Sequence, residues 1–77
     1  MSTDNELTWA NTDIGTHITT LRKAKGWSSY KLALNSGVSN SVLTRIEKGE
    51  REPKINTLLR IIEGLELNPA AFFSRFT

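Results

Sequence analysis

Apolar residues recur at spacings of three and four from Asp13 to the end of the chain, and the pattern divides into five short segments. This spacing is typical of amphipathic α-helices. Segments in which β-branched residues alternate with polar ones are absent, so the pattern predicts no β-strand. The chain has 77 residues, enough for one domain. We therefore predict an all-α domain of five helices.

Residues that start and end helices separate the five segments. Gly26, Gly37 and Gly49 each follow an apolar stripe, and glycine is the residue that most often ends a helix. Ser28 and Ser39 precede the second and third stripes, where a serine side chain can accept a hydrogen bond from a free backbone N–H group. The other expected helix starts are Thr12 or Asp13 for the first helix, about Lys54 for the fourth, and Asn68 followed by Pro69 for the fifth.

The beginning of the chain differs from the rest. Residues 1–12 are polar, and their apolar residues Leu7, Trp9 and Ala10 are isolated. We predict that residues 1–12 form a flexible N-terminal tail and that residues 13–77 form the helical domain.

The turn between the second and third predicted helices runs from Asn35 to Ser39 through Gly37. A glycine there can take a positive φ, which allows two helices to cross steeply within a few residues. An ordinary helical hairpin, with Gly37 only ending a helix, would fit the turn equally well. The third helix separates the two interpretations.

The outer face of the third helix carries polar side chains that can read DNA bases. If Leu43 and Ile46 face the core, short polar groups and one guanidinium share the outer face. Asn and Arg make paired hydrogen bonds to adenine and guanine edges, and Ser and Thr contact any base or a phosphate. A face that served only solubility would more often carry Glu and Lys. We predict that these residues contact base edges in the major groove, with Arg45 on guanine: Asn40, Ser41, Thr44 and Arg45.

Positive charge is concentrated in the middle of the chain. The net charge is only +2, but residues 22–54 hold eight basic and three acidic residues. This distribution fits a polyanionic partner, although an ordinary solvated basic face would show it too. We predict that the start of the second helix and the basic side chains on either side of the third bind DNA phosphates. These residues are Ser28, Ser29, Lys31, Lys48, Arg51 and Lys54.

Residues 14–67 resemble the lambda-repressor-like helix-turn-helix family, also called the xenobiotic-response-element family. The residues that carry the resemblance are Leu21-Arg22, Lys25-Gly26, Ser28, Leu32-Ala33, Gly37-Val38-Ser39, Ile46-Glu47-Lys48-Gly49, Pro53 and Leu58. It implies a five-helix DNA-binding domain with the helix-turn-helix at helices two and three, and an ion pair between Arg22 and Glu47. Two positions depart from the family. Ser29 stands where Gln is frequent, and Trp27 stands where Leu or Met is favoured.

The chain is also similar to the short controller proteins of restriction–modification systems and to small phage or plasmid repressors. This similarity implies a transcriptional regulator that binds an inverted-repeat operator as a homodimer, in the cytoplasm of a bacterium. The alternative is an antitoxin, which would bind a toxin protein and regulate its own operon. Neither interpretation implies a cofactor or a small-molecule effector.

The C-terminal third carries more apolar surface than a small core needs. The apolar residues of the fourth helix cover an arc of roughly 160°, wider than one buried stripe of about 100°. Phe76 adds a third aromatic ring to those of Phe72 and Phe73. We predict a two-fold dimer whose interface includes Leu65, Leu67, Phe72 and Phe73. Alternatively, the fifth helix folds back and buries its phenylalanines in its own domain.

Composition argues against catalysis and metal binding. The chain has no cysteine and one histidine, His17, so neither a thiolate nucleophile nor a zinc ligand set can be assembled. We expect His17 to be solvated and without function. No apolar run is long enough to cross a bilayer. The sequence therefore predicts a DNA-binding protein and not an enzyme.

Overall fold

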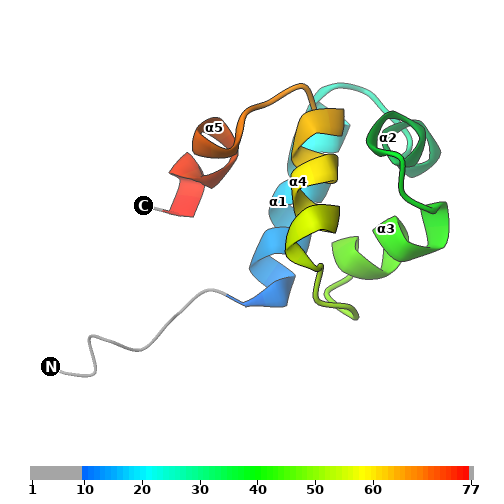
Figure 1. The fold of residues 1–77 in the computed structure, drawn as a ribbon, viewed down its shortest axis with the longest axis horizontal. Coiled ribbons are helices and arrows are strands. Elements are labelled where there is room, and N and C mark those ends of the chain that lie inside the picture. The colour runs from blue at the N-terminus through cyan, green and yellow to red at the C-terminus, as the bar shows by residue number, and fades with distance from the viewer. Residues whose placement is uncertain (1–9, 77) are drawn as a thin grey trace, which may run out of the picture.

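The computed structural model describes residues 10–76. These residues form the helices α1 (Asn11–Ala24), α2 (Ser29–Ser36), α3 (Asn40–Glu47), α4 (Ile55–Gly64) and α5 (Pro69–Phe73), followed by a 3₁₀ turn, η2 (Ser74–Phe76) (Figure 1). No strand occurs between residues 10 and 76. The prediction of an all-α, five-helix fold is confirmed.

Side-chain caps start three of the helices where the sequence predicted them. The Ser28 Oγ accepts from the backbone N–H of Lys31 at 3.1 Å, and the Ser39 Oγ accepts from Val42 at 3.2 Å. The Asn68 Oδ1 accepts from the N–H of Ala71 at 2.8 Å. Each cap satisfies one of the free donors in the first turn of its helix.

The first helix starts earlier than predicted. Its N-cap is Ala10 and its first residue is Asn11, so the caps expected at Thr12 or Asp13 were wrong. Asp13 lies in the first turn, where its Oδ2 accepts from the N–H of Ala10 at 2.7 Å. A carboxylate in this position also interacts favourably with the positive end of the helix dipole. Asn11 and Thr12 therefore belong to α1, and residues 1–9 of the predicted tail lie outside the described residues.

One core joins all five helices. α1 packs on α3, α2 packs on both α3 and α4, and α5 packs on α4. Buried side chains from each helix meet at the centre: Ile18, Leu32, Ala33, Leu43, Ile46, Leu58, Ile61, Ile62, Leu65 and Phe72. Burying a Leu, Ile or Phe side chain contributes about 1.5–3 kcal/mol each. This shared core therefore holds α2 and α3 in position.

Two glycines allow the helices to approach closely. A Cβ on Gly15 of α1 would meet the carbonyl oxygens of Ile46 and Glu47 at the end of α3. A Cβ on Gly64 of α4 would meet the side chain of Ser36 in α2. Any larger residue at either position would therefore push a helix of the motif away from the core.

His17 is not solvated, contrary to our expectation. Its ring is half-buried and lies 4.7 Å from the ring of Phe72 and 5.4 Å from that of Phe76, measured between centroids. Its Nε2 lies 2.9 Å from the carbonyl oxygen of Phe72, and since a carbonyl can only accept, Nε2 carries the proton. Sequence periodicity missed this contact because its partner is 55 residues away. His17 therefore packs α5 against α1.

Two of the four residues predicted at a dimer interface are buried inside the single chain. The side chains of Leu65 and Phe72 have no exposed surface, so no second chain can touch them, and their assignment to an interface was wrong. α5 folds back onto its own domain at Phe72, as the alternative interpretation expected. Phe73 remains 36% exposed and Leu67 is half-buried.

An ion pair joins the end of α3 to α1. The Nε and Nη2 of Arg22 donate to the two carboxylate oxygens of Glu47, at 2.8 and 3.0 Å. The Nη1 of Arg22 donates to the carbonyl of Trp27 at 2.8 Å, directly before α2. The two side chains of the pair are only 13% and 9% exposed. The pair implied by the family resemblance is therefore present, and it also holds the loop that leads to α2.

Replacing Glu47 with glutamine should destabilise the fold strongly. The substitution keeps the shape of the side chain but leaves the Arg22 guanidinium without its counter-charge in a largely buried site. Breaking a buried pair in this way costs about 3–5 kcal/mol. Thermal melts of Glu47→Gln should show the loss, with Glu52→Gln as a control at an exposed loop position. Equal melting temperatures for the two variants would contradict the structural role of the pair.

Candidate nucleic-acid interface

The outer face of α3 is oriented as the sequence predicted. Leu43 and Ile46 are fully buried, and the opposite side of the helix faces solvent. Asn40, Ser41 and Arg45 are exposed. Thr44, on the edge of this face, is half-buried. The four predicted base-reading residues therefore share one accessible surface.

The turn before α3 sets the angle of that surface. Gly37 ends α2 with a φ of 72°, a conformation that other residues adopt only at a cost. Val38 follows and packs partly against the core, between the two helices. Ser39 then caps α3 through the N–H of Val42. Together they place the start of α3 at one end of the molecule, beside α2 (Figure 1).

The four polar side chains differ in what they can offer a ligand. The Asn40 amide and the Arg45 guanidinium form no hydrogen bond or ion pair with other described residues, so all their donors are available. The hydroxyl of Thr44 donates to the carbonyl of Asn40 at 2.8 Å. Its proton is thus committed, and Thr44 can offer only an acceptor oxygen and a methyl group. The Ser41 Oγ lies 3.5 Å from the Ser39 Oγ and remains exposed.

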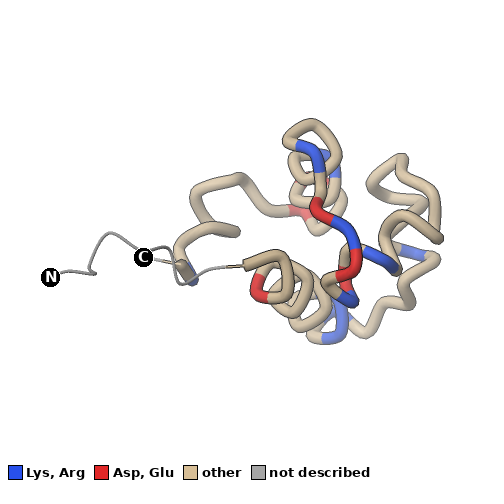
Figure 2. Tube along the Cα trace, turned by 90° about the horizontal axis from the view of Figure 1, so that it is seen from below, with Lys and Arg blue, Asp and Glu red and all other residues tan. Residues whose placement is uncertain are grey.

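The predicted phosphate-binding residues come before and after α3 in the chain. Ser28 and Ser29 form the start of α2, and Lys31 follows in its first turn, with its Nζ 5.6 Å from the centre of the Trp27 ring. Lys48 ends α3. Arg51 and Lys54 lie in the loop to α4, where acidic and basic residues alternate (Figure 2). All four basic side chains are exposed, and their contacts with phosphate stay a prediction.

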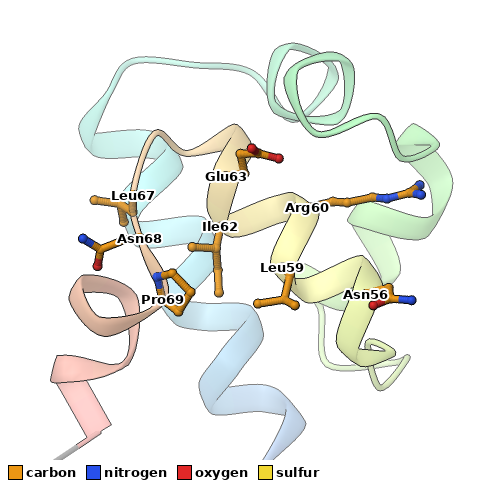
Figure 3. A pocket seen from close by; sticks show the side chains of 8 residues that line it. All are labelled: Asn56, Leu59, Arg60, Ile62, Glu63, Leu67, Asn68 and Pro69. Carbon is orange, nitrogen blue, oxygen red and sulfur yellow. The ribbon is translucent and has the colours of Figure 1, made fainter.

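A groove between α4 and α5 was not predicted. It has a volume of about 590 Å³. All the residues that line it come after α3 in the chain. Leu59 and Ile62 point from α4 toward Pro69 at the start of α5, whereas Arg60 and Asn56 extend away from them (Figure 3). The excess apolar arc of α4 was the signal for this groove, because Leu59, which lines it, is 43% exposed.

Neither a metal site nor a membrane-spanning helix is found between residues 10 and 76. No group of three or more His, Cys, Asp or Glu side chains there could hold a metal ion. No helix in the same part of the chain has the length and apolar character needed to cross a bilayer.

Curated relatives share the sequence of this domain. The model of a helix-turn-helix family matches residues 18–72. The transcriptional regulator SutR of Escherichia coli is 38% identical over 61 residues, which make up 79% of this chain and 34% of SutR. The regulator SlrR of Bacillus subtilis is 38% identical over 65 residues, or 43% of its length. The chain thus spans less than half the length of these relatives.

Solved structures of similar size share the fold. The restriction–modification controller protein C.AhdI from Aeromonas hydrophila superposes with a TM-score of 0.77 at 30% identity, over 82% of this chain and 96% of that one. The controller protein C.Esp1396I, solved as a tetramer on its 35-base-pair operator, gives a TM-score of 0.83 at 26% identity, over 90% and 91% of the two chains. With the motif at α2 and α3 and the family match over residues 18–72, the chain belongs to the helix-turn-helix family.

Proposed function

We propose that the chain is a sequence-specific, double-stranded DNA-binding transcriptional regulator that acts as a homodimer on an inverted-repeat operator. The observation that carries the proposal is the outer face of α3, where Asn40, Ser41 and Arg45 are exposed opposite a fully buried face. Such a face at the second helix of a helix-turn-helix enters the major groove. The named relatives are transcriptional regulators and not enzymes. In this proposal the protein acts in the cytoplasm and needs neither a cofactor nor a small-molecule effector.

Specificity in this proposal comes from side chains with different hydrogen-bonding capacity. Arg45 supplies a fork of donors that matches the two acceptors of guanine. The Asn40 amide can pair with adenine through one donor and one acceptor. Thr44, whose proton is used within α3, suits a base that donates or a thymine methyl group.

Affinity for DNA comes mainly from contacts with the phosphates on either side of the major groove. The start of α2 presents free N–H groups to one phosphate. Lys31 adds a point charge there, and Lys48, Arg51 and Lys54 add charges on the other side of α3. Each phosphate that they neutralise releases bound counterions from DNA, so binding becomes weaker as salt rises.

The groove between α4 and α5 supports the homodimer. One recognition helix reads only a few base pairs, whereas a two-fold dimer places a second helix about 34 Å away in the next turn of the major groove. Leu67 and Phe73 keep their place in the proposed interface, and Leu59 and Ile55 extend its apolar surface. An antitoxin would instead use such a surface for a different protein. The relatives named above favour the regulator.

Replacing Arg45 with alanine should relax specificity at one base pair. The loss of a paired contact to guanine should cost about 1–3 kcal/mol on the preferred operator and less on variants at that base pair. The preferred operator is first selected from random duplexes. The affinity of each protein for this operator and for its single-base variants then gives the specificity profile. Arg75→Ala removes the same charge from η2 and serves as the control, because η2 lies at the opposite end of the molecule from α3 (Figure 1). A specificity profile that Arg45→Ala leaves unchanged would rule out this role.

Replacing Lys48 with alanine should make DNA binding less dependent on salt. If Lys48 neutralises one phosphate, its loss should reduce the slope of log affinity against log salt by about one unit, for all sequences alike. Titrations between low and physiological salt measure the slope. Arg75→Ala should leave this slope unchanged. An equal slope for Lys48→Ala and the unmodified chain would exclude a contact between Lys48 and a phosphate.

A lysine in place of Leu59 should prevent dimerisation. Leu59 is 43% exposed in the single chain, so the charge is tolerated in the monomer but repels its counterpart in a two-fold interface. Sedimentation equilibrium at micromolar concentration should give twice the 8.6 kDa mass for the unmodified chain and the monomer mass for Leu59→Lys. Leu34→Gln, at an exposed position of α2, should remain dimeric. An unmodified chain that is monomeric in solution and stays monomeric on operator DNA would contradict the homodimer.

A further inference from the structure

The loop between α1 and α2 brings two lysine side chains to one aromatic ring. The Nζ of Lys25 lies 4.8 Å from the centre of the Trp27 ring, and the Nζ of Lys31 lies 5.6 Å from the same ring. At these distances the negative face of an aromatic ring attracts a cation. Lys25 follows α1, and Lys31 lies in the first turn of α2. The Trp27 ring therefore gathers positive charge from two helices.

Trp27 is held at both ends of its backbone. Its N–H donates to the carbonyl of Arg22 at 3.2 Å, and its own carbonyl accepts from the Nη1 of Arg22 at 2.8 Å. Its side chain is half-buried and packs against the core. Because the backbone and one side of the ring are both held, the ring is a fixed support for the lysines that contact it.

The two lysines differ in their other partners. The Nζ of Lys25 also pairs with the Oε1 of Glu66, at 3.2 Å. Glu66 has a φ of 65°, which residues other than glycine adopt at a cost, but a glycine there could not supply this carboxylate. Lys31 forms no ion pair with any residue from 10 to 76. The charge of Lys25 is thus balanced within the protein, whereas that of Lys31 is available to a ligand.

Free backbone donors lie next to the charge of Lys31. The N–H of Lys31 donates to the Ser28 Oγ, and that of Leu32 donates to the Ser28 carbonyl. The N–H groups of Ser29 and Tyr30 have no acceptor among residues 10–76. They lie at the positive end of the helix dipole. The contact with Trp27, which precedes α2, shows that the Lys31 side chain runs back toward these donors.

We propose that Trp27 is a positioning residue for DNA binding, whose ring holds the ammonium group of Lys31 beside the free N–H groups of α2, where it can bind a DNA phosphate. The inference rests on the proposed function, because it requires a duplex at the start of α2. A lysine side chain loses rotamer freedom when it is fixed in a contact. The ring restricts Lys31 before DNA arrives, so less of this entropy is lost on binding.

The chemistry of the ammonium group allows it to contact the ring and a phosphate together. The group carries three N–H donors and no acceptor. The ring lies on one side of Lys31, so the donors on the other side remain free for phosphate oxygens. If Lys31 had to leave the ring to reach a phosphate, Trp27 would instead weaken DNA binding. The sign of the effect therefore separates the two cases.

The test is a double-mutant cycle on affinity for the selected operator, with the unmodified chain, Trp27→Leu, Lys31→Ala and the double variant. Leucine keeps an apolar side chain against the core but has no aromatic face. Trp27→Leu should weaken binding about two- to fivefold, in line with exposed cation–π contacts. The same change should have no effect in the Lys31→Ala background. A loss of structure alone would weaken binding equally in both backgrounds.

Two further variants serve as controls. Lys54→Ala removes another exposed charge that is predicted to bind phosphate but has no contact with the ring. In this background Trp27→Leu should weaken binding by the same factor as in the unmodified chain. Trp27→Phe keeps an aromatic face and should retain part of the affinity. The effect of Trp27→Leu should be equal on the operator and on an unrelated duplex, because phosphate contacts carry no sequence information.

Nuclear magnetic resonance of the free protein measures the ring contact without DNA. The ring current of Trp27 should shift the resonances of the Lys31 side-chain methylene protons, and Trp27→Leu should abolish this shift. The resonances of Lys23, which is exposed on α1 and has no contact with the ring, should not change.

Three results would overturn the positioning role: a loss of affinity that is equal with and without Lys31, no loss at all, or tighter binding by Trp27→Leu. Failure of the proposed function would look different. The unmodified chain and its variants would then all fail to bind DNA, while the Lys31 shift in the free protein would still depend on Trp27. That result would leave a ring contact with no role in DNA binding, and would overturn the inference as well.

Discussion

The position of the recognition helix depends on one guanidinium group. Arg22 projects from α1 and uses three of its nitrogens: two donate to Glu47, the last residue of α3, and one donates to the carbonyl of Trp27 before α2. A single planar group with fixed donor directions thus holds together α1, the end of α3 and the loop before α2. An apolar contact at the same place would hold the helices together but would not fix the rotation of α3 about its axis.

Close packing beneath this group reinforces its effect. Gly15 lets the backbone of α1 approach the end of α3, where the carbonyls of Ile46 and Glu47 leave no room for a side chain. Leu43 and Ile46 are buried in the core on the inner side of α3. Because packed interiors resist small changes of volume, α3 presents its outer side chains on a rigid support. Such a support is what discrimination between bases requires, since paired hydrogen bonds tolerate little displacement.

The C-terminal part of the chain shows how a small domain divides its apolar residues between a core and a surface. Phe72 is buried and His17 packs against it through ring contact and a hydrogen bond to its carbonyl. Phe73, the next residue, points away and is 36% exposed. Consecutive residues on a helix face in directions about 100° apart, so α5 completes the core with Phe72 and leaves the ring of Phe73 at the surface.

The sequence alone determined those features that depend on residues near one another in the chain. The five helices, the caps at Ser28, Ser39 and Asn68, and the glycine turn at Gly37 all follow from local hydrogen bonding and backbone preference. The outer face of α3 could be predicted as well, because helical periodicity identifies Leu43 and Ile46 as the buried side. The pairing of Arg22 with Glu47 came from a family resemblance and not from the spacing of the residues.

Only the tertiary structure decided which apolar residues remain at the surface. Helical spacing places Leu58, Leu59, Ile61 and Ile62 on one broad stripe, but the contacts of α4 with α2 and α5 bury three of them and leave Leu59 exposed. The same contacts bury Leu65 and Phe72, which the pattern had suggested for an interface, and leave Tyr30 and Leu34 exposed on α2. Burial depends on which helix lies opposite, and that neighbour comes from a distant part of the chain. Local periodicity carries no information about it.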